Sequence, residues 1–257
     1  MNHLNVSLDN KKLTSISPYI IIKSVEEQSP NVNIAVTSVA SGIGQRVTQI
    51  ERRFMDVVVK FAINLMKGHE SQRTQILNDV NKWGAEGKTL RVSNRPNVHL
   101  SVMMVTQLAP GYVRKWNEEY SITFRAYTVP FWENDEVTSV TLKNQSSASA
   151  SLSLSSNAKT PLRVYVKNTS QSSLTSIEFS CNGKKIKIDG LSVASGGNVD
   201  VDYENGLITI ETNGKSAYSK RTADSSDDVW LFPGGNTVSF KSNVAAEWQV
   251  YCYERWL

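Results

Sequence analysis

A strand-like alternation of apolar and polar residues is the feature that most limits how this chain can fold. Between residues 54 and 66, apolar side chains occupy every second position, and Asp56, Lys60 and Asn64 lie between them. A period of two places apolar side chains on one face of an extended strand and polar side chains on the other. The same alternation returns at 98–104 and 120–127. The sequence therefore predicts a chain built mainly from half-buried β-strands.

One segment has the period of a helix instead. Ile76, Leu77, Val80 and Trp83 repeat at helical spacing within residues 70–83. Gly84 follows directly, and glycine is the usual residue in the left-handed conformation that ends a helix. We therefore expect a single helix over 70–83 with Gly84 as its cap.

The second half of the chain has the pattern of short strands separated by tight turns. Its turn signals are Asn182-Gly183, Asn205-Gly206 and Asn213-Gly214, because both central residues of a common two-residue hairpin turn need a positive φ. The strands expected around these turns are 162–168, 174–181, 184–189, 198–203, 207–212, 236–241 and 246–256. Many short strands joined by turns are typical of a β-sandwich or barrel.

The composition changes after Trp132, which suggests a domain boundary. Residues 133–136 are Glu-Asn-Asp-Glu, and the stretch 146–156 is mostly Ser and Ala. That stretch fits either a flexible linker or a strand of small residues, because its two leucines are two positions apart. We place the boundary near residue 134, giving an N-terminal domain of residues 1–134 and a C-terminal domain of residues 135–257. The first holds 16 basic and 11 acidic residues, and the second holds 12 and 13.

The chain is poor in the residues that enzymes and metal sites use. It has three His and two Cys in 257 residues, and it lacks G-x-S-x-G and H-E-x-x-H motifs. Cys181 and Cys252 fall on apolar strand faces, so we interpret both as core residues. The net charge of +4 is not gathered into the dense basic patch of a nucleic-acid binder, and no apolar stretch is long enough to span a membrane. We therefore expect no catalytic residues, no cofactor, no metal site, no specific nucleic-acid binding and no membrane partner.

The second half also carries a particular order of motifs. The hairpin at 182–188 is followed by strands at 198–202 and 207–212, then by Leu231-Phe232-Pro233-Gly234-Gly235-Asn236 and finally by Tyr253-Glu254-Arg255-Trp256-Leu257. This order resembles the C-terminal domain of the distal tail proteins (Dit) of siphophages and their prophages. The strand at 53–65, the helix at 70–83 and the Pro-Phe-Trp ending at 130–132 are similar to the N-terminal domain of that family.

The resemblance implies a fold and a structural role. The implied fold is mainly β, with an N-terminal β-sandwich or barrel that holds one helix and a C-terminal galectin-like antiparallel β-sandwich. The implied protein is not an enzyme but a part of the virion tail tip, the baseplate hub, made in the bacterial host cytoplasm during assembly. Its N-terminal domains would form a homo-hexameric ring that joins the tail tube protein to a tail-associated lysin or to baseplate and receptor-binding proteins.

Five residues are candidates for contacts with partners. If the strand at 54–66 lies near the ring, Asp56 and Lys60 are candidates for the ring interface. The alternative function is that of a carbohydrate-binding β-sandwich protein involved in host-surface adhesion. In that case Trp230, Tyr251 and Tyr253 would contact the sugar, because aromatic faces pack well on pyranose rings.

Overall fold

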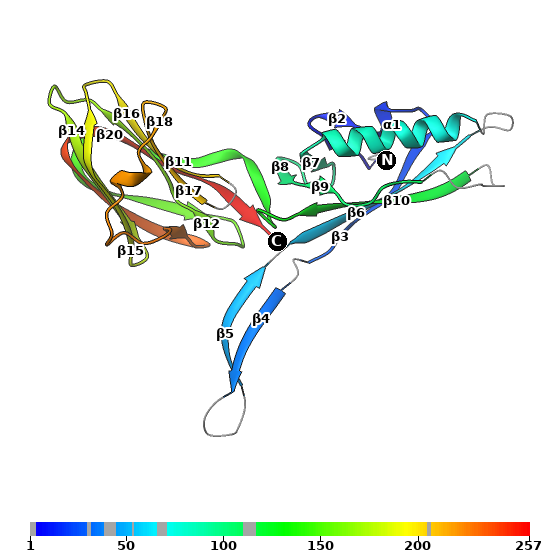
Figure 1. The fold of residues 1–257 in the computed structure, drawn as a ribbon, viewed down its shortest axis with the longest axis horizontal. Helices are drawn as coiled ribbons and strands as arrows, with labels where there is room; N and C mark the ends of the chain where they lie inside the picture. The colour runs from blue at the N-terminus through cyan, green and yellow to red at the C-terminus, as the bar shows by residue number, and fades with distance from the viewer. Residues whose placement is uncertain are drawn as a thin grey trace. The chain divides into compact units, whose positions relative to one another are not determined.

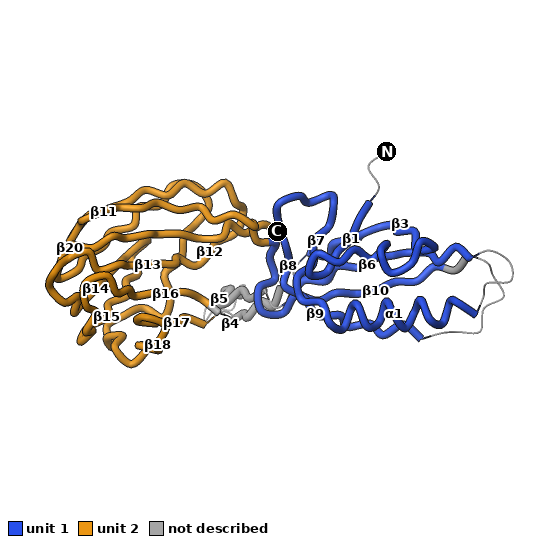
Figure 2. Tube along the Cα trace, turned by 90° about the horizontal axis from the view of Figure 1, so that it is seen from above, with its two compact units in different colours: residues 1–132, 257 blue, residues 133–256 orange. Residues whose placement is uncertain are grey.

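The computed structural model describes residues 4–29, 32–38, 45–52, 54–65, 71–109, 117–204 and 207–257. The chain divides into two compact units, one formed by Met1–Trp132 with Leu257 and the other by Glu133–Trp256 (Figure 2). The described residues form mostly antiparallel β-strands and one α-helix, which confirms the predicted mainly-β class (Figure 1). No helix within these ranges has both the length and the apolar character needed to cross a membrane.

Unit 1 is organised around a four-stranded antiparallel sheet in the order β3-β6-β10-β9. Its strands are β3 (Ile20–Glu27), β6 (Met55–Asn64), β9 (Met103–Met104) and β10 (Asn117–Ala126). A smaller sheet in the order β8-β7-β1-β2 is formed by β1 (Val6–Leu8), β2 (Lys11–Lys12), β7 (Thr89–Val92) and β8 (Val98–Ser101). A separate antiparallel pair is formed by β4 (Val32–Ser38) and β5 (Gln45–Arg52).

Helix α1 (Gln72–Glu86) covers one face of the four-stranded sheet (Figure 1). The ring of Trp83 on the helix meets the ring of Phe124 on β10 edge-on, with the centroids 5.9 Å apart. On β6, the side chains of Val57, Val59 and Phe61 are fully buried. The predicted alternation around 54–66 is therefore confirmed, and its apolar face packs under the helix.

The predicted cap of the helix is wrong. Helix α1 continues past Gly84 to Glu86, and Gly87 follows it in an extended conformation with φ −83° and ψ 143°. Gly84 is buried within the helix, where an added Cβ would lie 2.1 Å from Sδ of Met104. The glycine therefore permits the close approach of β9 to the helix, and it does not provide a left-handed turn.

Unit 2 is a sandwich of antiparallel strands that share one core. Its main path runs β18-β17-β16-β13-β20-β11, while β14 joins β15 to β20, and β12 pairs with β19. Residues from both layers, among them Val201 of β16 and Phe179 of β14, belong to a single hydrophobic cluster. The strands are β11 (Trp132–Leu154), β12 (Thr160–Pro161), β13 (Arg163–Asn168), β14 (Leu174–Cys181), β15 (Lys184–Val193), β16 (Asn198–Glu204), β17 (Leu207–Thr212), β18 (Lys215–Ser216), β19 (Trp230–Leu231) and β20 (Gly234–Trp256).

The predicted strands 236–241 and 246–256 are one strand, β20, that belongs to both layers. Residues 239–242 pair with β14, whereas residues 246–251 pair with β13. Phe240 and Trp248 stack with ring centroids 4.9 Å apart, although eight positions in a straight strand span about 26 Å. The strand therefore bends sharply from one layer to the other, as corner strands of sandwiches do. Ser242 and Asn243 interrupt the apolar alternation at this bend, so the sequence pattern indicated two strands.

Other sequence features of unit 2 are confirmed. The Ser-rich stretch is strand up to Leu154, with Ala150, Leu152 and Leu154 buried and the intervening serines exposed. Positive φ values occur at both residues of Asn182-Gly183 and of Asn213-Gly214, while Asn205-Gly206 lies outside the described residues. Cys181 and Cys252 are free and buried, and burial raises the pKa of both thiols.

Strand β20 ends in two buried charges with different partners. The carboxylate of Glu254 accepts a hydrogen bond of 2.7 Å from Thr138 Oγ1 and bonds of 2.8 Å from the backbone N–H groups of Ser155 and Ser156. Arg255 Nε donates to Glu133 Oε1 at 2.9 Å, and the two side chains are only 9% and 14% exposed. The end of β20 is therefore fastened both to the start of β11 and to the segment that follows β11.

Replacing Glu254 tests this fastening. Burial alone would raise its pKa, but the hydrogen bonds from Thr138, Ser155 and Ser156 hold the pKa below the ordinary 4.5. A carboxyl group with a lowered pKa in the folded state stabilises the protein above its unfolded pKa, and this contribution is lost as the pH falls through the folded pKa. We expect Glu254→Gln to lower the free energy of unfolding by about 1.5–3 kcal/mol at pH 7.

The measurement is urea denaturation at pH 7 and at pH 3, with Glu136→Gln on the exposed part of β11 as the control. The gap between wild type and Glu254→Gln should narrow at pH 3, whereas the control should follow wild type at both values. Equal stability of wild type and Glu254→Gln at pH 7 would show that the hydrogen bonds contribute no net stability.

Candidate functional site

The two residues predicted for a ring interface lie on β6, on the face of the sheet that points away from α1. The carboxylate of Asp56 accepts two hydrogen bonds of 2.6 Å, from Nε and Nη2 of Arg125. Lys60 Nζ lies 2.5 Å from a carboxylate oxygen of Glu26. Both charges are therefore already paired between neighbouring strands of the same sheet.

The pair of Asp56 and Arg125 is a structural unit of this face. The Asp56 side chain is 9% exposed, and the Arg125 guanidinium lies 4.1 Å from the ring centroid of Phe54. The hydrogen bonds that Arg125 donates to Asp56 raise the pKa of Arg125 above its ordinary value. The assignment of Asp56 and Lys60 to a ring interface stays a prediction. A substitution at Asp56 would disturb the sheet itself, in addition to any contact with another copy.

The two edges of the same sheet carry exposed apolar side chains. Strand β3 forms one edge and β9 the other. Ile21 on β3 is 44% exposed, and Met103 on β9 is 55% exposed. Ile22 and Val25 pair in register with core residues of β6, yet both are only half-buried. Each edge therefore combines exposed aliphatic side chains with a strand that, among the described residues, has a sheet neighbour on one side only. The side chains on the β3 edge differ from those on the β9 edge.

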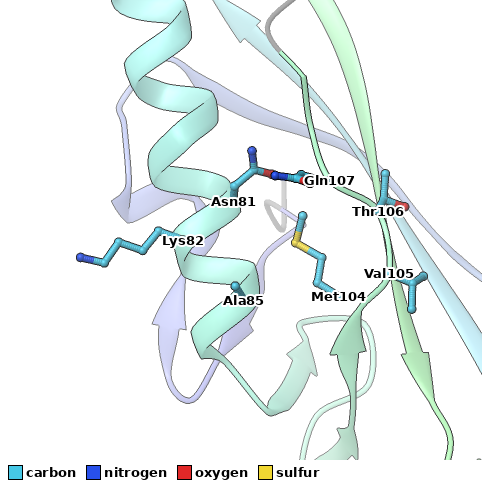
Figure 3. Close-up of a pocket in the computed structure, with 7 residues that line it drawn as sticks. All are labelled: Asn81, Lys82, Ala85, Met104, Val105, Thr106 and Gln107. Carbon is cyan, nitrogen blue, oxygen red and sulfur yellow. The ribbon is translucent and has the colours of Figure 1, made fainter.

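A groove of about 410 Å³ lies between α1 and the segment around β9 (Figure 3). Asn81 bridges the two walls, because its amide donates to the carbonyl of Leu108 at 2.8 Å and accepts from the Leu108 N–H at 2.9 Å. The ionisable side chain in the lining is Lys82, so the lining residues contain no acid–base pair. The full lining is Asn81, Lys82, Ala85, Met104, Val105, Thr106 and Gln107.

The aromatic residues predicted for a sugar contact lie on β20 and β19 of unit 2. Register places Arg163 of β13 opposite Tyr251, and the Arg163 guanidinium lies 4.8 Å from the ring centroid of Tyr253. Lys159 Nζ lies 4.4 Å from the ring centroid of Trp230. A cation therefore already covers one face of two of the three rings, and a pyranose would have to use the opposite faces. The sugar contact of these residues stays a prediction.

Two carboxylates flank Arg163 on the outer face of β16. Arg163 is 7% exposed, and its Nε donates to a carboxylate oxygen of Asp202. Asp200 pairs in register with Tyr165 and Glu211, and its buried Oδ1 has no hydrogen-bond partner. Burial raises the pKa of Asp200, and the nearby charges of Asp202 and Glu211 raise it further. In the described part of the chain, no group of three or more His, Cys, Asp or Glu side chains is arranged to hold a metal ion.

Sequence reasoning missed Lys159 and Arg163. Lys159 directly precedes β12, and Arg163 is the first residue of β13. The rings that they contact lie on strands far away in the sequence. The local pattern therefore could not assign these cations to their aromatic partners.

The buried Oδ1 atom of Asp200, which has no hydrogen-bond partner, gives a stability prediction. Because its folded pKa is raised, the ionised group destabilises the fold above its unfolded pKa, and this cost disappears as the pH falls below it. We expect Asp200→Asn to increase the free energy of unfolding at pH 7 by about 1 kcal/mol, the scale of relieving one unsatisfied buried group.

Thermal unfolding followed at pH 7 and pH 3.5 measures this effect. The gain should shrink at pH 3.5, which lies below both the ordinary pKa of Asp and the raised pKa of folded Asp200. Asp189→Asn, at an exposed position of β15, is the control and should change the stability little. A loss of stability in Asp200→Asn at pH 7 would mean that the carboxylate has a stabilising partner.

Comparison with known proteins finds a match to a tail-protein domain in the second half of the chain. Residues 155–256 match the family model described as the C-terminal domain of the siphovirus-type tail component, SPP1 Dit. No curated protein matches the chain. The matched range lies entirely within unit 2 and contains β20 with its Glu254–Arg255 end.

Solved structures share the fold along both units. The crystal structure of the SPP1 Dit (gp 19.1) protein, described as a paradigm of the hub adsorption apparatus in phages that infect Gram-positive bacteria, superposes with a TM-score of 0.75. It is 16% identical, and the match covers 99% of each chain. A chain of the phage P2 baseplate in its activated conformation with Ca has a TM-score of 0.53 at 7% identity, covering 98% of this chain and 97% of that one. Residues 155–256 are therefore similar to the C-terminal domain of the siphovirus-type tail component, and the chain shares the fold of SPP1 Dit along its length.

Proposed function

We propose that this protein is a structural component of the tail tip of a siphophage or prophage. Six copies form a ring that joins the tail tube protein to a tail-associated lysin or to baseplate and receptor-binding proteins. The observation that carries the proposal is the tail-component domain at residues 155–256, on a chain with the fold of a phage hub protein. The role is architectural and does not require catalysis.

The open sheet of unit 1 supports a ring. A ring of identical copies needs two different, complementary surfaces on each copy, because its contacts run head to tail. The β3 and β9 edges are two such surfaces, since they bound the same sheet on opposite sides. Open strand edges bind further strands readily, and exposed aliphatic side chains add apolar burial to the backbone hydrogen bonds. In this proposal β3 of one copy meets the β9 edge of the next.

Unit 2 supports the joining role. Its sandwich has a hydrophobic cluster of its own, from Ala150 to Cys252, and so does not depend on the sheet of unit 1 for its stability. A ring built through unit 1 therefore leaves unit 2 free to hold other tail proteins. This division supports a proposed location in the virion tail tip, after production of the protein in the host cytoplasm.

Charged substitutions at the two edges test the ring. In tail particles, or with the tail tube protein present, wild type should assemble with a mass of six copies by light scattering. Ile21→Asp and Met103→Asp should each leave single copies, because a carboxylate at the edge would have to be buried without a partner. Circular dichroism should be unchanged, since both side chains are exposed.

Leu207→Asp in unit 2 is the matched control, because Leu207 is 73% exposed and lies on neither edge. It should assemble like wild type. Assembly of both edge variants at the wild-type mass would exclude the edges as the contact. A wild-type protein that stays monomeric beside the tail tube protein would contradict the ring itself.

A further inference from the structure

The loop that joins β19 to β20 presents apolar side chains on a fixed backbone. Phe232 is 48% exposed, whereas Asn236 at the base of the loop is 3% exposed. Asn236 Oδ1 accepts from the Phe232 N–H at 2.9 Å, and its Nδ2 donates to the carbonyls of Phe232 and Gly234 at 2.7 and 3.0 Å. One buried amide therefore holds both sides of an exposed turn.

A second amide anchors the loop to the hairpin between β14 and β15. Asn182 Nδ2 donates to the Trp230 carbonyl at 3.0 Å and to Asn236 Oδ1 at 3.1 Å. The loop is thus braced at Trp230 and at Asn236. A loop that is ordered before it binds loses little conformational freedom on binding, so its contact surface is used efficiently.

Trp230 and Phe232 lie on the same side of this segment. They are two positions apart, and Leu231 between them is buried in the core. The indole of Trp230 is itself held, because its Nε1 donates to Asp228 and Lys159 covers one ring face. Pro233 next to Phe232 is also exposed, and we name the segment with Trp230, Phe232 and Pro233 the Trp230–Pro233 knob.

Two exposed lysines lie beside the knob. Lys159 and Lys184 are exposed, and Lys184 lies beside the Asn182-Gly183 turn that braces the loop. The carboxylate of Asp228 is engaged by the indole N–H. Aromatic side chains in a rigid setting with a polar rim are typical of the residues that dominate protein interfaces. The complementary surface is an apolar pocket edged by carboxylates.

We propose that the Trp230–Pro233 knob docks into an apolar pocket, edged by carboxylates, on a different protein of the tail. The identity of the partner as a tail protein rests on the proposed function. A second copy of this chain fits less well, because the groove beside α1 is lined by no carboxylate that could pair with the lysines beside the knob. A glycan also fits less well, because Lys159 covers a face of the Trp230 ring.

Photo-crosslinking in assembled tails tests the docking. p-Benzoylphenylalanine replaces Phe232 in the full chain, and tail particles are purified from cells that produce the chain with its tail gene cluster. We expect a crosslink to one other tail protein, at a peptide rich in Asp and Glu when identified by mass spectrometry. The control places the same probe at Tyr218, which is 47% exposed in the same unit.

Each other result overturns the proposal in a recognisable way. A crosslink only to a second copy, only to glycan, or no stronger from position 232 than from position 218 refutes the docking and leaves the tail function standing. Absence of the wild-type chain from the tail particles refutes both. The two failures are therefore distinguishable.

A charge comparison then tests the acidic rim. A Cβ added at Gly235 meets no heavy atom within 4 Å, so a longer side chain there leaves the loop intact. Gly235→Glu should weaken binding to the crosslinked partner at least tenfold relative to Gly235→Lys, a change of similar size and opposite charge. Phe232→Ala should weaken binding at least tenfold relative to wild type. Equal affinities of the Glu and Lys variants would refute the carboxylate rim.

Discussion

Two adjacent buried charges at the end of β20, Glu254 and Arg255, need their partners, and this need constrains how the strands of unit 2 pair. Neighbouring residues in a strand point to opposite faces, so Glu254 and Arg255 fasten different segments from one place in the chain. A shift of β20 by one residue would exchange these faces and leave both charges buried without partners, which is far costlier than losing an apolar contact. The register of β20 fixes in turn its pairing with β13 and with β14.

Local pattern was enough to predict most elements, because alternation and helical spacing are properties of neighbouring residues. It predicted the face of β6 that packs under α1 and the positive φ at Asn182-Gly183. It was wrong where a distant contact determined the local geometry. Gly84 accommodates Met104 of another element, and the bend in β20 is stabilised by the stacking of Phe240 on Trp248.

The same distinction applies to the candidate surfaces. Asp56 and Lys60 have the pattern of solvated strand residues, and the family resemblance, which implies that their strand lies near the ring, made them candidates for an interface. Their partners Arg125 and Glu26 lie on other strands, 69 and 34 positions away. Likewise, alternation placed Tyr251 and Tyr253 on one face of the last strand, but it carried no information on the guanidinium of Arg163. Charges and rings that look available in a sequence are often already engaged once strands are paired.

The passage of β20 through both layers also has a mechanical consequence. Because one continuous strand is hydrogen-bonded to β13 in one layer and to β14 in the other, tension along it is shared by two sheets. Under such tension the hydrogen bonds from β20 to β13 and to β14 must break together, whereas those of an edge strand can open one at a time. Unit 2 should therefore resist pulling along its last strand.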